Sequence, residues 1–159
     1  MKAIFLDRDG ILNIEIGNYI CSKEDLTMNK GSLEFLKMAI SKGYKLIVIT
    51  NQGGISKGLY SKEILKTIHE KMTTLYKEEG VFFEEIFYCP HHSNIEKCLC
   101  RKPHGLMIEK ALQKYKLNKN DCFMIGDTER DKQAAESAGI KGYLVASNSS
   151  LSPLLHLLA

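Results

Sequence analysis

Two pairs of acidic residues in this chain have the spacing of a divalent-metal and phosphoryl-transfer site. Asp7 and Asp9 are separated by one residue and directly follow an apolar segment, residues 2–6. Asp127 ends a second apolar segment, and Asp131 comes four residues later. Carboxylates this close repel one another, and Mg²⁺, which prefers oxygen ligands, would relieve the repulsion. In such a site Asp7 could attack phosphorus, Asp9 could exchange protons with the leaving oxygen and with water, and Asp127 could complete the metal site.

Each acid also has a simpler interpretation. Asp7 and Asp9 could be two solvated loop acids, because an Asp-x-Asp pair is common on protein surfaces. Asp131 could lie in the first turn of a helix, where an acid suits the helix dipole. It could equally hold a metal ligand in place without binding the metal itself.

Two further segments could bind a phosphate group. The first offers a hydroxyl, two amides and backbone N–H donors after an apolar strand, in the order Thr50, Asn51, Gln52, Gly53 and Gly54. The second carries two cations, Arg101 and Lys102, and Lys102 could neutralise charge on transferring phosphoryl oxygens. Taken alone, the first segment is also compatible with an ordinary turn and the second with solvated surface cations.

A cluster of metal-binding residue types precedes these cations. Three thiols and an imidazole suit tetrahedral Zn²⁺, and they fall within residues 89–100 as Cys89, His91, Cys98 and Cys100. The alternative is a set of buried cysteines, and His92 competes with His91, which we prefer. The spacing differs from that of a zinc finger, so it does not indicate nucleic-acid binding. A structural zinc here would hold Arg101 and Lys102 toward the phosphate.

Apolar strands alternate with amphipathic helices along the whole chain, which predicts an α/β fold. The expected strands are 2–6, 45–50, 85–88, 122–126 and 143–145. The expected helices are 31–42, 61–79, 105–115, 131–138 and a short one at 153–158. We predict a three-layer, Rossmann-like parallel sheet with helices on both faces, as a single domain over residues 1–159. Such sheets bind ligands at the carboxyl ends of their strands, where the acids and Thr50 lie.

Composition narrows the class of protein. The chain has 159 residues, of which 44% are hydrophobic, and a formal net charge of +3, too mild to indicate nucleic-acid binding. No apolar run reaches the roughly 20 residues of a membrane helix, and the N-terminus has no signal-peptide pattern. The five cysteines are an odd number in a chain without an export signal, so a disulfide framework is not expected. We expect a cytoplasmic monomer that binds neither nucleic acid nor membrane.

The motifs, taken in their order along the chain, resemble those of the haloacid dehalogenase superfamily, and the resemblance covers essentially the whole chain. The residues that carry the resemblance are Asp7-Arg8-Asp9-Gly10-Ile11, Thr50, Lys102, Gly126-Asp127 and Asp131. It implies a Rossmann-like fold, a requirement for Mg²⁺, Asp7 as the nucleophile and Asp9 as the acid and base. It also implies catalytic roles for Thr50 and Lys102. Mg²⁺ would be held by the side chains of Asp7 and Asp127 and by the backbone carbonyl of Asp9.

The zinc loop, residues 89–100, resembles that of the capless branch with histidinol phosphatases and heptose-bisphosphate phosphatases. Membership would imply no large cap domain, a structural zinc and a small phosphorylated metabolite as the substrate. The substrate contacts implied are Asp7, Arg8, Asp9, Tyr19, Thr50, Asn51, Gln52, Gly53, Arg101 and Lys102.

Residues 50–58, Thr-Asn-Gln-Gly-Gly-Ile-Ser-Lys-Gly, fit the heptose members better. The expected reaction is removal of the 7-phosphate of D-glycero-D-manno-heptose 1,7-bisphosphate through an aspartyl-phosphate, a step toward lipopolysaccharide. Histidinol phosphate is the alternative substrate. A non-catalytic zinc-stabilised binding module is a second alternative, against which the complete set of motif residues argues.

The sequence departs from this pattern at three places. Thr128 stands where heptose enzymes often have Lys, residues 15–19 form a loop one residue longer than expected, and Ile11 replaces the commoner Thr. One substrate cation is therefore missing. We expect Arg101 to contact the part of the substrate that does not react, with Lys57 as a helper.

Overall fold

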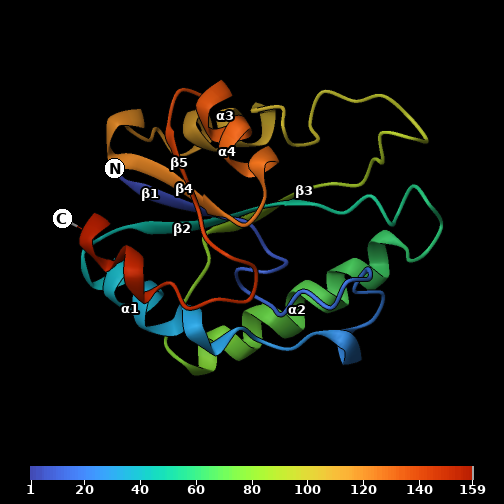
Figure 1. The fold of residues 1–159 in the computed structure, drawn as a ribbon, viewed down its shortest axis with the longest axis horizontal. Coiled ribbons are helices and arrows are strands. Elements are labelled where there is room, and N and C mark those ends of the chain that lie inside the picture. The colour runs from blue at the N-terminus through green and yellow to red at the C-terminus, as the bar shows by residue number, and fades with distance from the viewer. Residues whose placement is uncertain (159) are drawn as a thin grey trace.

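Five parallel strands form one sheet at the centre of the protein, in the order β3-β2-β1-β4-β5 (Figure 1). The computed structural model describes residues 1–158. The strands are β1 (Ala3–Leu6), β2 (Lys45–Asn51), β3 (Glu85–Cys89), β4 (Cys122–Gly126) and β5 (Lys141–Leu144). The α-helices are α1 (Leu33–Ser41), α2 (Lys62–Glu78), α3 (Leu106–Lys114) and α4 (Glu129–Ser137). Short 3₁₀ helices cover Lys23–Asp25, Lys30–Ser32, Lys119–Asp121 and Ser152–Leu157.

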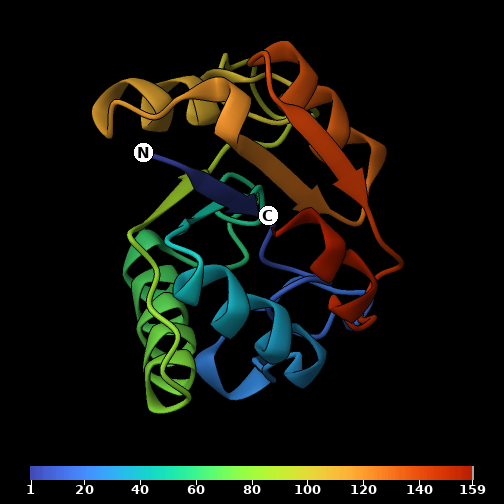
Figure 2. The same cartoon turned by 90° about the vertical axis from the view of Figure 1, so that its left-hand side faces the viewer.

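The helices cover both faces of the sheet, so the predicted three-layer α/β fold is confirmed. Figure 1 shows α1 and α2 on one face and α3 and α4 on the other, and Figure 2 shows the last 3₁₀ helix beside α1. Alternate strand residues point to opposite faces: Ile4 and Leu6 pack in the core under α1 and α2, Ala3 and Phe5 in the core under α3 and α4. Because both faces of the central strands are covered, β1, β4 and most of β2 are buried and largely apolar, whereas the edge strands β3 and β5 are more exposed.

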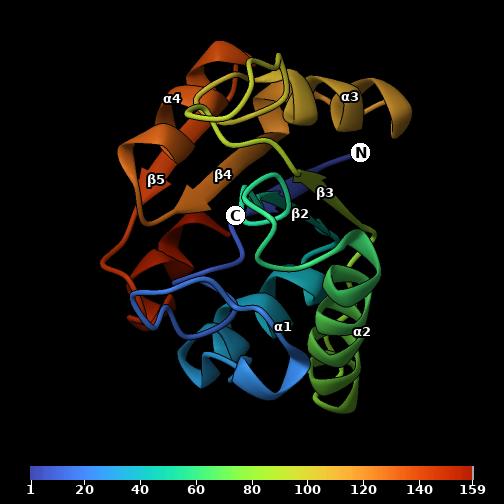
Figure 3. The same ribbon diagram turned by 90° about the vertical axis from the view of Figure 1, so that its right-hand side faces the viewer.

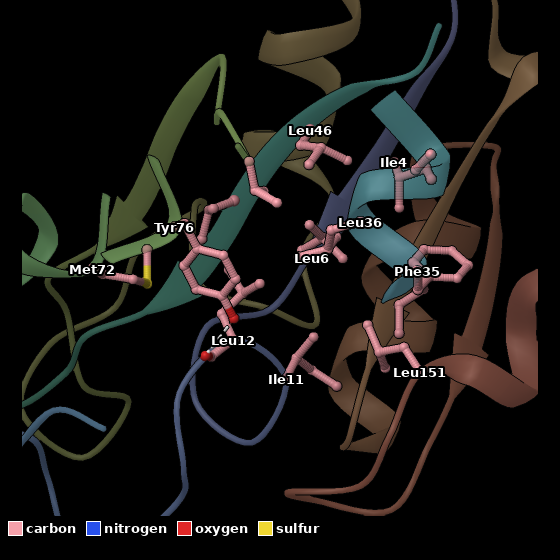
Figure 4. Close-up of a cluster of buried hydrophobic side chains, with 14 of the residues drawn as sticks. Ile4, Leu6, Ile11, Leu12, Phe35, Leu36, Leu46, Met72, Tyr76 and Leu151 are labelled. Atoms are coloured by element: carbon pink, nitrogen blue, oxygen red, sulfur yellow. Dashed lines mark hydrogen bonds between the residues drawn. The ribbon is translucent and has the colours of Figure 1, made fainter. Parts of the chain in front are cut away.

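A buried tyrosine, Tyr76, lies in the core between the sheet and helices α1 and α2. Tyr76 of α2 packs among the side chains drawn in Figure 4, and its hydroxyl donates a hydrogen bond of 2.7 Å to the carbonyl of Leu12. The same hydroxyl lies 2.7 Å from Ser32 Oγ. These bonds tie α2 to the segment that follows β1, and therefore to the position of Asp7 and Asp9.

The strand order brings three carboxyl ends together. Leu6 of β1 pairs with Val48 of β2 and with Ile125 of β4, so Asp7 lies level with Gly126, the last residue of β4, and just short of the end of β2 at Asn51. The chain adds β2 and β3 on one side of β1 and then β4 and β5 on the other. Ligands of open α/β sheets bind where the strand order reverses in this way.

Three details differ from the sequence-based expectation. Helix α4 begins at Glu129, earlier than residue 131, because the Asp131 carboxylate accepts hydrogen bonds from Thr128 N–H and Oγ1–H and so stabilises its first turn. Ile64, an apolar residue of the amphipathic helix expected over residues 61–79, is 40% exposed, because α2 turns Leu65 to the core instead. The segment near the end, predicted as a helix, is a 3₁₀ helix. No helix within residues 1–158 is long and apolar enough to cross a membrane.

Candidate active site

Lys102 joins the ends of three strands at the centre of the site. Its side chain is 3% exposed, and its ammonium donates to Asp7 Oδ1 at 2.8 Å, to Asp131 Oδ1 at 2.6 Å and to the carbonyl of Ile49 at 2.9 Å. All three ammonium protons are therefore used. These contacts bring together Asp7, Lys102 and Asp131, which are far apart in the sequence.

Asp7 is buried and oriented by the backbone as well. Its Oδ1 accepts a second hydrogen bond from Arg8 N at 2.8 Å, and no described residue donates to Oδ2. Burial raises the pKa of Asp7 to about 8, although the Lys102 ammonium lowers it. The site therefore lacks enough positive charge for its carboxylates.

Three carboxylates could share a cation here. Oxygen atoms of Asp7, Asp127 and Asp131 all lie within 4.8 Å of one another. Burial, together with repulsion from Asp131, also raises the pKa of Asp127. An all-oxygen donor set with unneutralised charge fits Mg²⁺. Asp131 is already occupied by Lys102 and by the N–H groups of Asp127 and Thr128, so its own contacts suit it to holding Lys102 and α4 in place.

Asp9 is held separately from this cluster. Its Oδ1 accepts from Arg8 Nη2 at 2.8 Å and from Asn13 Nδ2 at 3.0 Å, and its Oδ2 accepts from Gln52 Nε2 at 3.2 Å. Burial by itself would raise the pKa of Asp9. The Arg8 guanidinium, with smaller contributions from Asn13 and Gln52, outweighs burial, and the pKa of Asp9 is lowered. Arg8 is 1% exposed, and its Nη1 lies 3.2 Å from His69 Nε2. The Arg8 guanidinium therefore contacts Asp9 and His69. Its expected contact with substrate stays a prediction.

The segment after β2 positions other residues of the site. The Asn51 amide makes a pair of hydrogen bonds to the Lys102 backbone, donating to its carbonyl at 3.1 Å and accepting from its N–H at 2.9 Å. Gln52 donates to Thr50 Oγ1 at 2.9 Å and accepts from the hydroxyl of Tyr60 at 2.6 Å. The Asn51 side chain therefore positions Lys102, and the Gln52 side chain contacts Thr50 and Asp9. Their expected contacts with substrate stay predictions.

A cavity of about 510 Å³ opens above these groups, large enough for a small metabolite. It lies among the loops that follow the strands, on the side of the molecule that faces the viewer in Figure 3. Of the residues expected to contact substrate, all but the buried Thr50 line it. Gly53 allows a close approach: a Cβ there would lie 3.1 Å from Arg101 Nη1 and 3.1 Å from the His91 carbonyl.

Sequence reasoning missed four residues of the site. His92 and Arg130 line the cavity, whereas Asn13 contacts Asp9 and Tyr60 contacts Gln52. His92 had been considered only as a zinc ligand. His69 of α2 is buried against Arg8, and the distance between the two residues in the sequence left no signal for this contact. Arg130 carried no signal, because the helix was expected to begin only at residue 131.

The cysteine loop forms a second, compact cluster. Cys89 Sγ lies 3.0 Å from Cys100 Sγ and 3.6 Å from Cys98 Sγ, and His91 Nδ1 lies 3.3 Å from Cys100 Sγ. The three cysteines are free, and the four donor atoms all lie within 4.8 Å of one another. His92 lies outside this cluster, and its Nδ1 accepts from Asn94 N. Three thiols and an imidazole around one point are a donor set that fits Zn²⁺.

Asp7 has the two properties that a carboxylate needs to attack phosphorus, a fixed orientation and one oxygen without a donor. Together with the strand order, this agrees with the resemblance to hydrolases of the haloacid dehalogenase (HAD) superfamily. The HAD-hydrolase-like family model matches residues 99–156.

Relatives in bacteria extend the match to most of the chain. The chain is 43% identical over 145 residues to the D-glycero-beta-D-manno-heptose-1,7-bisphosphate 7-phosphatase of Helicobacter pylori strain 26695, covering 91% of this chain and 83% of that protein. It is 38% identical to the corresponding alpha-anomer enzyme of Photorhabdus laumondii, covering 88% and 79%. The chain therefore belongs to the heptose-bisphosphate phosphatase family of HAD hydrolases.

A solved structure agrees with this assignment. The D,D-heptose 1,7-bisphosphate phosphatase of B. bronchiseptica, complexed with magnesium and phosphate, superimposes with a TM-score of 0.86 at 30% identity. The alignment covers 100% of this chain and 87% of that one. The expected fold without a large cap domain is confirmed by this likeness.

Proposed function

We propose that this protein is a Mg²⁺-dependent phosphatase that removes the 7-phosphate of D-glycero-D-manno-heptose 1,7-bisphosphate. The observation that carries the proposal is the contact between Lys102 and Asp7, which orients a buried carboxylate at the base of the cavity. The identity to heptose-bisphosphate phosphatases supports this substrate, and it does not favour histidinol phosphate. A complete set of charged groups also argues against a non-catalytic binding module.

In the first half-reaction, Asp7 attacks the phosphorus of the 7-phosphate. A bond forms between the carboxylate and phosphorus, and the bond between phosphorus and the C7 oxygen breaks. Lys102 holds Asp7 and faces the charge on the phosphoryl oxygens. Asp9 gives a proton to the departing C7 oxygen, which leaves as the hydroxyl of heptose 1-phosphate.

In the second half-reaction, water attacks the phosphorus of the aspartyl-phosphate. Asp9 accepts a proton from this water, inorganic phosphate leaves and the Asp7 carboxylate is restored. The contacts of Asp9 with Arg8 and Gln52 favour its ionised form, which suits the base role. Proton donation in the first half therefore requires that bound substrate weakens the pair between Arg8 and Asp9.

Two metals have separate roles in this proposal. Asp7, Asp127 and the backbone carbonyl of Asp9 would hold Mg²⁺, which supplies positive charge to the reacting phosphate. Cys89, His91, Cys98 and Cys100 would hold a structural Zn²⁺. The donor types in the two clusters support this division, since thiolates select zinc and carboxylates select magnesium.

We also propose that residues 1–159 act as one phosphatase domain, with residues 89–100 as its zinc loop. One continuous sheet with a helical layer on each face supports a single domain. A thiolate-rich metal site and a phosphorylated sugar substrate both suit the reducing cytoplasm. We also propose that the protein acts as a monomer.

The test is a side-by-side measurement of kcat/KM for heptose 1,7-bisphosphate and for histidinol phosphate, with Mg²⁺ present. We expect the heptose substrate to be preferred by at least about 100-fold, because its second phosphate adds binding energy. A preference for histidinol phosphate would overturn the substrate while leaving the nucleophile in place. No turnover of either compound, or of a generic phosphate ester, would favour the binding module.

A further inference from the structure

The buried cations of the active site have no capacity left for a second phosphate. Lys102 donates all three protons to Asp7, Asp131 and Ile49, and the Arg8 guanidinium contacts Asp9 and His69. A bisphosphate nevertheless brings a second group of comparable charge into the same cavity. The cations that could receive it must therefore come from the rim.

Two arginines from different segments line that rim. Arg101 follows the cysteine loop, and Arg130 lies in the first turn of α4, just after Asp127. Arg101 donates from Nη1 to the His91 carbonyl at 3.0 Å, which fixes the guanidinium beside the cavity. Within residues 1–158, neither arginine forms an ion pair with a carboxylate. Both charges are therefore available to a bound anion.

Arg130 is placed unfavourably for the stability of its own helix. It is the second residue of α4, where the positive end of the helix dipole repels a cation. It is exposed, and it does not pair with the neighbouring Glu129. Packing and helix stability therefore give no reason for an arginine here, whereas an anion in the cavity does.

An acid in the lining, Glu15, suits a different ligand group. Glu15 accepts a hydrogen bond from Gly17 N through Oε1, at 2.8 Å, and lies in the loop with Tyr19. A carboxylate repels phosphate but accepts hydrogen bonds from sugar hydroxyls. The lining thus offers cations at Arg101 and Arg130 and an acceptor for sugar hydroxyls at Glu15.

We propose that Arg130 is a second cation for the phosphate that is not hydrolysed, beside the contact already expected of Arg101, and that Arg130 makes the enzyme selective for a sugar bisphosphate over a sugar monophosphate. This inference rests on the proposed function for the identity of the substrate. The phosphate at this position would also offset the repulsion between Arg130 and the α4 dipole.

The test compares kcat/KM for heptose 1,7-bisphosphate with that for heptose 7-phosphate, which lacks the remote phosphate. Wild type, Arg130→Ala, Arg130→Lys and the control Lys110→Ala are measured; Lys110 is an exposed cation of α3 outside the cavity. We expect Arg130→Ala to lose about 10- to 100-fold on the bisphosphate and at most about threefold on the monophosphate. Arg130→Lys should recover most of the loss, and Lys110→Ala should lower neither value.

Three results would count against the inference or separate it from the proposed function. Equal losses on both substrates would place Arg130 at the reacting phosphate, and no loss on either would make it a solvated surface residue. Failure of the wild type to hydrolyse either heptose compound would overturn the proposed function instead. In that case the same comparison with fructose 1,6-bisphosphate and fructose 6-phosphate tests the rim by itself, and equal losses there overturn the inference.

Discussion

At the scale of single residues, the site separates a nucleophile from a proton carrier although the two acids are almost adjacent in the sequence. Asp7 lies on the Lys102 ammonium, whereas Asp9 turns to Arg8, Asn13 and Gln52. Different partners give opposite effects: burial raises the pKa of Asp7, and Arg8 lowers that of Asp9. Two carboxylates in distinct environments can take distinct roles in one reaction.

Asp7→Asn tests the nucleophile. The amide keeps the shape of the side chain but cannot form the aspartyl-phosphate, so kcat should fall by about 10³-fold or more. The fold should survive, as judged by circular dichroism and by a cooperative thermal transition. Asp25→Asn, at an exposed acid outside the cavity, serves as the matched control and should keep the wild-type rate. A rate for Asp7→Asn within tenfold of wild type would remove Asp7 from the role of nucleophile.

At the scale of elements, the segment from β3 to α3 is fixed at two points. At the start of this segment, Cys89 contacts Cys100 in the cysteine cluster. Near the end of the segment, the Asn51 amide is hydrogen-bonded to the Lys102 backbone. Between them, Arg101 is tied to the carbonyl of His91. A long segment without helix or strand can therefore present Arg101 and Lys102 in fixed positions, as a preorganised site requires.

The two metals should respond differently to a chelator. Mild EDTA should remove Mg²⁺ from the carboxylates and leave Zn²⁺ on the thiolates, so activity should return when Mg²⁺ alone is added. Elemental analysis of protein purified without chelator should give about one zinc per chain. Cys98→Ser should lower this value and the rate, whereas Cys21→Ser, a free cysteine outside the cluster, should not. Protein that is free of zinc yet fully active would contradict the structural role.

At the scale of the whole molecule, the alternation of apolar runs with amphipathic helices was enough to predict the sheet, its parallel strands and both helical layers. The residues at the strand ends came together because parallel strands share one carboxyl edge. The partner of Arg8 could not be predicted in this way, because His69 lies 61 residues away and belongs to the buried face of a helix. The position of Arg130 in the cavity lining could not be predicted either, because it depends on where α4 begins and on how that helix is oriented.

The pair of Arg8 and His69 also fixes a protonation state. An arginine can only donate, so His69 Nε2 must accept, and the ring is neutral with its proton on Nδ1. A second positive charge would be buried next to the guanidinium. Burial, with a further contribution from Arg8, accordingly lowers the pKa of His69 to about 3.

This low pKa predicts a loss of stability in mild acid. In the unfolded chain His69 takes up a proton near its ordinary pKa of about 6.5, whereas in the folded chain it stays neutral down to about pH 3. The unfolded state therefore binds more protons between these values, and the free energy of unfolding falls as the pH falls. From pH 7 to pH 5 the contribution of His69 should be about 2 kcal/mol.

Urea unfolding at both pH values measures this contribution by comparison with His69→Gln. The glutamine carbonyl can still accept from Arg8 but does not titrate, and every other group of the protein is shared with the wild type. The wild type should therefore lose about 2 kcal/mol more than His69→Gln between pH 7 and pH 5. His156→Gln, at an exposed histidine, should follow the wild type. Equal losses for wild type and His69→Gln would mean that the folded protein protonates His69, and then Arg8 could not be held between His69 and Asp9 as the structure places it.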